Sequence, residues 1–205
     1  ELYSSKTQIA DFKLFLANEC DQFNALGEAY GTASGSKYYK EVEKLEKILD
    51  SNELDNPTYN ALHVFIIALY TGFRYGDYKN FNNFKGKDWI EVEPEKTMRS
   101  TGQVVRLPLH FKAKQLLNGQ YTIMKNQPFN RYIKIACAKA GIERPNEITS
   151  HTARHTFATR LVDLSTDLKT IQDFLGHKDY RSALVYAKVS DSKKVSVMDK
   201  FGYVA

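Results

Sequence analysis

The chain has 205 residues, of which 42% are hydrophobic and 26% are charged, a composition that allows a packed core and argues against global disorder. No apolar run approaches the ~20 residues that cross a bilayer, so we expect no membrane-spanning helix and no membrane partner. The net charge is +5, and the two cysteines, Cys20 and Cys137, lack metal-ligand spacing, which predicts free thiols in a reducing cytoplasm.

The first part of the chain predicts a short N-terminal segment followed by two helices. Residues 1–36 combine apolar positions at helical spacing with a glycine- and serine-rich end, so we expect a helical segment and a linker there, and a main domain over residues 37–205. Residues 39–50 have the apolar spacing of a helix. Asn56, as an N-cap, and Pro57 form a helix-start signal for the next one.

An arginine follows directly after this second helix. Gly72 ends the helix in the manner of a glycine just past the last turn. Arg74 comes two residues later, and Asp77 follows three residues after that. A lone arginine after a helix is usually solvated, but here the glycine and the nearby carboxylate could hold its side chain at a fixed angle.

The middle of the chain predicts a hairpin and two more helices. Residues 89–92 and 104–109 are expected to form two strands joined by a polar loop, with Lys96 on the turn side. Most lysines in such a place are solvated. Helices are expected over residues 110–117 and 129–140.

The last part of the chain predicts a run of helices. Ser150 is a suitable N-cap for a helix that ends near residue 164, and another helix is expected over residues 167–175. A short apolar helix over residues 182–189 and an amphipathic tail over residues 190–205 follow. We therefore expect a mainly α-helical protein with a small antiparallel β-sheet, which is an α+β fold.

The helix after Ser150 and the segments behind it carry side chains suited to a phosphodiester. Arg154 offers a planar fork of donors to phosphate oxygens. His151 and His177 can donate hydrogen bonds or move protons near neutral pH. Tyr186 carries a hydroxyl that can form a covalent intermediate, although a buried tyrosine with a satisfied hydroxyl is the commoner case.

The same histidines also suggest a metal site. His151, His155 and His177 are the ligand type, but no carboxylate or cysteine lies at a supporting spacing among them. Arg154 between two of them would repel a cation. We therefore expect neither a metal nor another cofactor.

The order and spacing of these residues are more specific than any one of them. In chain order they are Arg74 after Thr-Gly-Phe, a lysine in a hairpin, His151-x-x-Arg154-His155, Leu-Gly-His ending at His177, and Tyr186 nine residues later. Over residues 38–189 the chain resembles the tyrosine recombinase (phage integrase) family. Its end is similar to integrases of mobile elements from Bacteroides-type bacteria.

The resemblance implies a mostly helical catalytic domain and a role for each of these residues. Tyr186 would attack the scissile phosphate and become linked to the 3′ phosphate. Arg74 and Arg154 would hold the nonbridging oxygens, and His177 would add a donor. The implied activity is site-specific cleavage and rejoining of double-stranded DNA by a homotetramer at attachment or recombination sites, without metal or ATP.

Three further roles follow from the resemblance. His151 would assist proton transfer at the nucleophile, Lys96 would protonate the leaving 5′-oxygen, and Asp77 would buttress the region around Arg74. The loop that follows this lysine is long for the family, so Lys87 is an alternative, although Lys96 fits better. The N-terminal region is shorter than the DNA-clamping domain that usually precedes this catalytic domain, and it could be the tail of one.

Charge distribution bears on the partner. Residues 1–100 carry 12 basic and 16 acidic side chains, whereas residues 101–205 carry 17 basic and 8 acidic ones. A basic second half suits contact with phosphates, although excess lysine alone would look the same. A DNA-binding accessory protein without turnover and a type IB topoisomerase are the alternatives. All six catalytic positions are filled, which disfavours the first, and the bacterial integrase-like motif disfavours the second.

Overall fold

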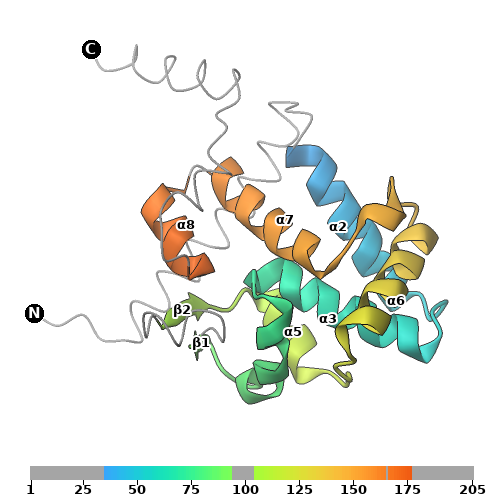
Figure 1. Ribbon diagram of the computed structural model, residues 1–205, viewed down its shortest axis with the longest axis horizontal. Helices are drawn as coiled ribbons and strands as arrows, with labels where there is room; N and C mark the ends of the chain where they lie inside the picture. The colour runs from blue at the N-terminus through green and yellow to red at the C-terminus, as the bar shows by residue number, and fades with distance from the viewer. Residues whose placement is uncertain (1–34, 94–103, 165, 177–205) are drawn as a thin grey trace, which may run out of the picture. The chain divides into compact units, whose positions relative to one another are not determined.

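The computed structural model describes residues 35–93, 104–164 and 166–176 (Figure 1). The chain divides into two compact units, Glu1–Tyr38 and Tyr39–Ala205, and nearly all described residues belong to the second. The helices predicted near both ends of the chain lie outside the described residues. The assignment of separate N-terminal and C-terminal segments therefore stays a prediction.

Along the described chain, helices precede and follow one two-stranded sheet. They are α2 (Gly35–Asp50), α3 (Asn56–Thr71), the 3₁₀ helix η1 (Tyr75–Phe84), β1 (Trp89–Val92), β2 (Val105–Pro108), α5 (Phe111–Asn118), α6 (Asn126–Lys139), the 3₁₀ helix η2 (Pro145–Glu147), α7 (Ser150–Asp163) and α8 (Leu168–Leu175). This mainly helical structure with a small antiparallel sheet confirms the predicted fold class. Within the described ranges no helix is both long and apolar enough to cross a membrane.

Helix α3 forms the centre of the core. Every side chain from residue 61 to residue 69 is buried. A helix that is apolar on every side needs cover all round, and α3 packs against α5, α6 and α7 (Figure 1). Cys137 of α6 is a free thiol buried in the same core, as expected. The end of α3 is therefore held firmly, which matters for the turn that follows it.

The hairpin confirms the predicted strand pair. Ile90 lies opposite Leu107 and Val92 opposite Val105 in an antiparallel register. These four side chains are buried while the positions between them are exposed, so one face of the sheet joins the core. Strand β2 also contacts α8, which links the sheet to the last described helix.

Four helices begin earlier than predicted, one of them α6, which begins at Asn126 rather than at residue 129. Helix α2 begins at Gly35, inside the expected linker, because glycine and serine are also tolerated at a helix start. Asp55 and Thr149 take the N-cap positions of α3 and α7, in place of Asn56 and Ser150. In both cases two neighbouring residues are good N-cap types, so composition alone could not choose between them.

Helix η1 was not predicted. Tyr78, Phe81 and Phe84 recur at every third residue and are buried, which is the period of a 3₁₀ helix. The rings of Tyr78 and Phe81 stack with centroids 4.9 Å apart. The signal was present in the sequence, but 3₁₀ segments of this length are uncommon.

Candidate functional site

Helix α7 is anchored at its first turn. The Thr149 amide donates a hydrogen bond to Thr152 Oγ1 (3.0 Å), and the Ser150 amide donates to Asn130 Oδ1 of α6 (2.8 Å). Amides at a helix start have no intrahelical acceptor, so these side chains satisfy them. The start of α7 is thereby fixed to α6, and with it the position of Arg154 one turn later.

Arg154 points from α7 into the protein and is only 8% exposed. Its Nη1 donates to the Gly72 carbonyl (2.9 Å) and its Nη2 to the Leu175 carbonyl (2.5 Å). Gly72 lies two residues before Arg74. Leu175 lies two residues before His177, which is itself outside the described residues. One guanidinium thus joins α7, the turn after α3 and the end of α8.

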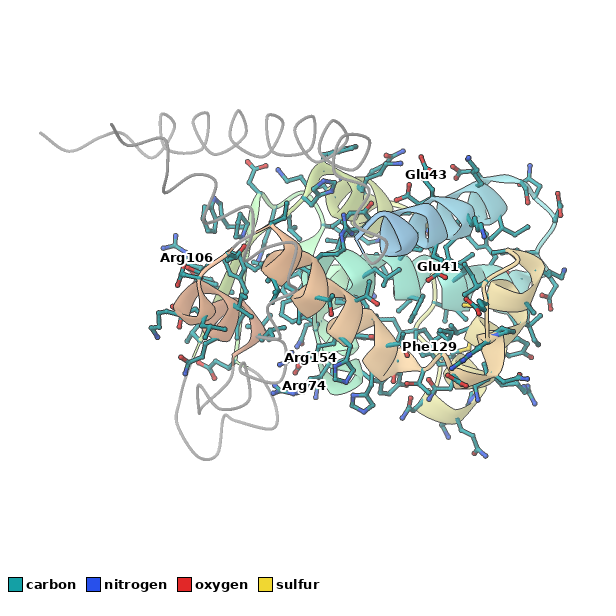
Figure 2. All side chains as sticks on the ribbon, turned by 90° about the horizontal axis from the view of Figure 1, so that it is seen from above. Glu41, Glu43, Arg74, Arg106, Phe129 and Arg154 are labelled. Atoms are coloured by element: carbon teal, nitrogen blue, oxygen red, sulfur yellow. The ribbon has the colours of Figure 1, made fainter. Side chains whose placement is uncertain are left out.

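Arg74 extends from a turn with a well-defined backbone. Gly72 has a left-handed conformation (φ 67°), and its amide donates to the Ala68 carbonyl (2.9 Å). The Arg74 carbonyl accepts the Asp77 amide (2.9 Å) at the start of η1. Arg154 binds the same turn, and Figure 2 shows the side chains of both arginines in one region of the protein.

The guanidinium of Arg74 is incompletely satisfied. Its Nη1 atom is buried and has no hydrogen-bond partner among the described residues. A buried donor without a partner costs roughly 1–3 kcal/mol, and more when the group is charged. Phosphate oxygens are strong acceptors for such a group. Two guanidiniums on separate elements make this turn suited to an anion.

Two tyrosines near the turn are structural supports. Tyr78 is fully buried, and its hydroxyl donates to the Ser150 carbonyl (3.5 Å). The Tyr75 hydroxyl donates to the Met124 carbonyl (2.5 Å), and its ring meets that of Tyr78 edge to face. Burial raises the pKa of both hydroxyls. Because nucleophilic attack requires the deprotonated oxygen, neither phenol suits that role.

The structure separates the three predicted residues of α7 by depth. His151 and His155 are exposed, whereas Arg154 is buried. Asp77 is buried in η1, and its role as a buttress stays a prediction. Lys87 is exposed in the turn between η1 and β1.

The remaining predicted site residues lie outside the described residues. These are Lys96, His177 and Tyr186. Their approach to the two arginines, and the choice between Lys96 and Lys87, stay predictions. In the part of the chain that the structure describes, no group of three or more histidine, cysteine or acidic residues could hold a metal ion.

Three groups at this turn were not predicted from the sequence. The carbonyls of Gly72 and Leu175 accept from Arg154, and the ring of Phe157 lies against Gly72. These partners are 82 and 21 residues from Arg154, beyond the reach of any local pattern. A glycine in a left-handed turn was nevertheless a signal that another group could approach the backbone closely.

Comparison with known proteins shows the family of the chain. The sequence model of the phage integrase family matches residues 38–193, which is more than half of the chain. The chain belongs to the phage integrase family. The resemblance inferred from the spacing of Arg74, Arg154 and Tyr186 is therefore confirmed, while the narrower likeness to Bacteroides-type integrases stays a prediction.

Relatives of this integrase-family chain match over limited segments. An integrase/recombinase of Escherichia coli is 44% identical over 66 residues, which cover 32% of this chain and 19% of that protein. A tyrosine recombinase XerD of Listeria monocytogenes is 32% identical over 107 residues, which cover 52% of this chain and 35% of that protein. The chain thus spans about a fifth to a third of these relatives.

Solved structures share the fold. The crystal structure of XerA recombinase has a TM-score of 0.53 at 21% identity and covers 82% of this chain and 62% of that one. The catalytic domain of bacteriophage HP1 integrase has a TM-score of 0.56 at 20% identity, with coverage of 78% and 90%. At these identities the likeness shows the fold alone.

Proposed function

We propose that this chain is the catalytic region of a site-specific DNA recombinase or integrase that cleaves and rejoins strands through a 3′-phosphotyrosine at Tyr186. Family membership supports the proposal. The single structural observation that carries it is the bond from Arg154 to the Gly72 carbonyl, because it draws the segment of Arg74 to that of Arg154 across 82 residues of sequence.

The proposed reaction uses side chains alone. The Tyr186 oxygen attacks phosphorus while the bond to the 5′-oxygen breaks, and His151 assists the removal of the phenolic proton. Lys96 supplies a proton to the leaving 5′-oxygen. Attack by another 5′-hydroxyl on the phosphotyrosine reverses these steps and joins the strands without ATP.

Arg74 and Arg154 would stabilise the charge that gathers on the nonbridging oxygens, with His177 as a further donor. Removing one such preorganised donor typically costs ~3–4 kcal/mol of transition-state stabilisation. Fixed cations of this kind can replace the metal ions that many nucleases use. The buried, unsatisfied Nη1 of Arg74 fits this role, since a phosphate oxygen would complete its hydrogen bonding.

The proposed partner is double-stranded DNA at attachment or recombination sites, bound by a homotetramer in the cytoplasm. The excess of basic residues in the second half of the chain suits a phosphate backbone. Among proteins of the same fold, the Tn1549 transposon integrase was solved with transposon right end DNA (TM-score 0.55, 19% identity, 77% of this chain and 64% of that one). XerH was solved on a difH substrate in a post-cleavage complex.

The test is covalent capture of DNA. The protein is incubated with labelled duplexes that carry one nick within a randomised stretch, because loss of the short fragment after cleavage traps the covalent intermediate. We expect a denaturation-resistant protein–DNA adduct with the parent and none with Tyr186→Phe. The captured duplex, which is the sequence recovered from the parent's adduct, should be bound as tightly by Tyr186→Phe as by the parent. Equal adduct from both proteins would refute Tyr186 as the nucleophile.

A further inference from the structure

The turn that carries Arg74 is in very close contact with α7. A methyl group placed on Gly72 would lie 2.3 Å from Cδ1 and 2.8 Å from Cε1 of Phe157. Distances this short are overlaps, so the ring occupies the space that any side chain at position 72 would need. Gly72 also has φ +67°, where other residues are strained. Two independent features thus reserve this position for glycine.

The same helix holds Gly72 in a second way. Arg154 lies three residues before Phe157 on α7, and its Nη1 donates to the Gly72 carbonyl (2.9 Å). The ring limits how closely the two backbones approach, while the hydrogen bond keeps them from separating. Because Arg74 is only two residues further on, the placement of Gly72 governs where its guanidinium begins.

We propose that Phe157 and Gly72 are positioning residues that set the distance between the Arg74 and Arg154 guanidiniums. Neither touches the reacting atoms; Phe157 acts through Gly72, and Gly72 acts through the backbone of Arg74. This inference deepens the proposed function and rests on it. The rate of strand cleavage should therefore depend on how the Phe157 ring packs against Gly72.

Phe157 is well placed for such a role. It is half-buried and packs against two apolar clusters, the main core around α3 and a smaller one that contains Ile171 and Leu175 of α8. Leu175 is also the residue whose carbonyl accepts from Arg154. The ring therefore lies where α3, α7 and α8 meet.

The test combines size changes at both positions. Gly72→Ala should slow covalent adduct formation at saturating DNA by about 100-fold, the effect of displacing a reacting group by ~1 Å. Phe157→Ala removes all three ring atoms that would meet the new methyl group. The double variant should therefore cleave about tenfold faster than it would if the two substitutions slowed cleavage independently. A coupling of this size is within the range measured for residues in contact.

Leu161→Ala is the matched control. Leu161 is another half-buried apolar residue of α7, one turn later, and among the described residues it packs against the smaller cluster and not the main core. Combined with Gly72→Ala it should give no rescue. All rates are measured as single turnovers on the captured duplex, well below each variant's melting temperature, and DNA affinity is measured separately.

The outcomes separate the two proposals. The positioning role alone would be overturned by a folded Gly72→Ala variant that cleaves at the parental rate. It would also be overturned by a double variant that cleaves no faster than independent effects of the two substitutions would give. Rescue by Leu161→Ala would overturn it as well, since that would show a general loosening of α7. A parent that forms no adduct would overturn the proposed function and, with it, the positioning role. In that case the melting temperatures of the single and double variants would still show whether Gly72 and Phe157 are in contact.

Discussion

Arg154 has a structural task besides the one proposed for it at the phosphate. It is buried, and its two Nη atoms donate to carbonyls on different elements. A lysine at this position would keep the charge but has one nitrogen rather than a planar fork. It could not reach the carbonyls of Gly72 and Leu175 in the same geometry.

We therefore expect Arg154→Lys to lower both activity and stability. Adduct formation should fall by about 10²–10³-fold, the loss typical of one preorganised donor. A buried carbonyl left without its donor should also destabilise the fold by roughly 1–3 kcal/mol. Single-turnover kinetics and urea unfolding measure the two effects. Loss of activity with unchanged unfolding would contradict the structural task.

His110 gives the fold a pH dependence. Burial, together with the nearby charges of Arg160 and Lys112, lowers the pKa of His110 from 6.5 to about 4. The ring stacks on Tyr70 with centroids 4.7 Å apart and accepts the Lys112 amide through Nδ1 (3.2 Å). The neutral ring is thus the form that the folded protein holds.

Because the folded pKa lies below the unfolded one, the unfolded chain takes up the proton first as the pH falls. Stability should therefore be lost between about pH 6.5 and about pH 4. His110→Asn keeps an acceptor for the helix start without a titrating ring, so its melting temperature should fall less over that range. Thermal melts of both proteins measure the difference. Equal slopes of melting temperature against pH in the two proteins would contradict the assignment to His110. Burial also lowers the pKa of His63, but His63 is present in both proteins and so does not contribute to the difference between them.

At the scale of elements, the site depends on how α7 begins. Its first turn is tied to α6 through Asn130 Oδ1, which accepts the Ser150 amide. Asn130→Ala should leave that amide without its acceptor and reduce the free energy of unfolding by about 1 kcal/mol. Asn130→Asp keeps an acceptor oxygen near a helix start, where negative charge is favourable, and should stay close to the parent. Urea unfolding compares them, and equal losses would argue against the bond.

Local sequence predicted most elements but not their contacts. The proline-marked start and glycine end of α3, the apolar stripe of α6 and the paired strands all arise from rules that act within a few residues. Helix η1 was missed because its three-residue period is rare at that length. N-cap positions were off by one wherever two suitable residues were adjacent, as at Asp55 and Thr149.

At the scale of the whole molecule, the sequence predicted the family but not the contacts between distant segments. The order and spacing of the motifs from Arg74 to Tyr186 indicated the family, which comparison confirmed. The two bonds of Arg154 to backbone carbonyls, and the ring of Phe157 on Gly72, depend on tertiary packing between α3, α7 and α8. No short-range pattern encodes such contacts, because their partners are set by how the helices pack.

The central claim is that the two arginines serve one phosphodiester that Tyr186 attacks. The most direct measurement is to trap the covalent protein–DNA adduct, digest both components and identify the modified peptide by mass spectrometry. We predict a nucleotide on Tyr186, within the tryptic peptide of residues 182–188, and a much reduced yield from Arg74→Ala. A nucleotide on any other peptide, or undiminished adduct without Arg74, would contradict the account.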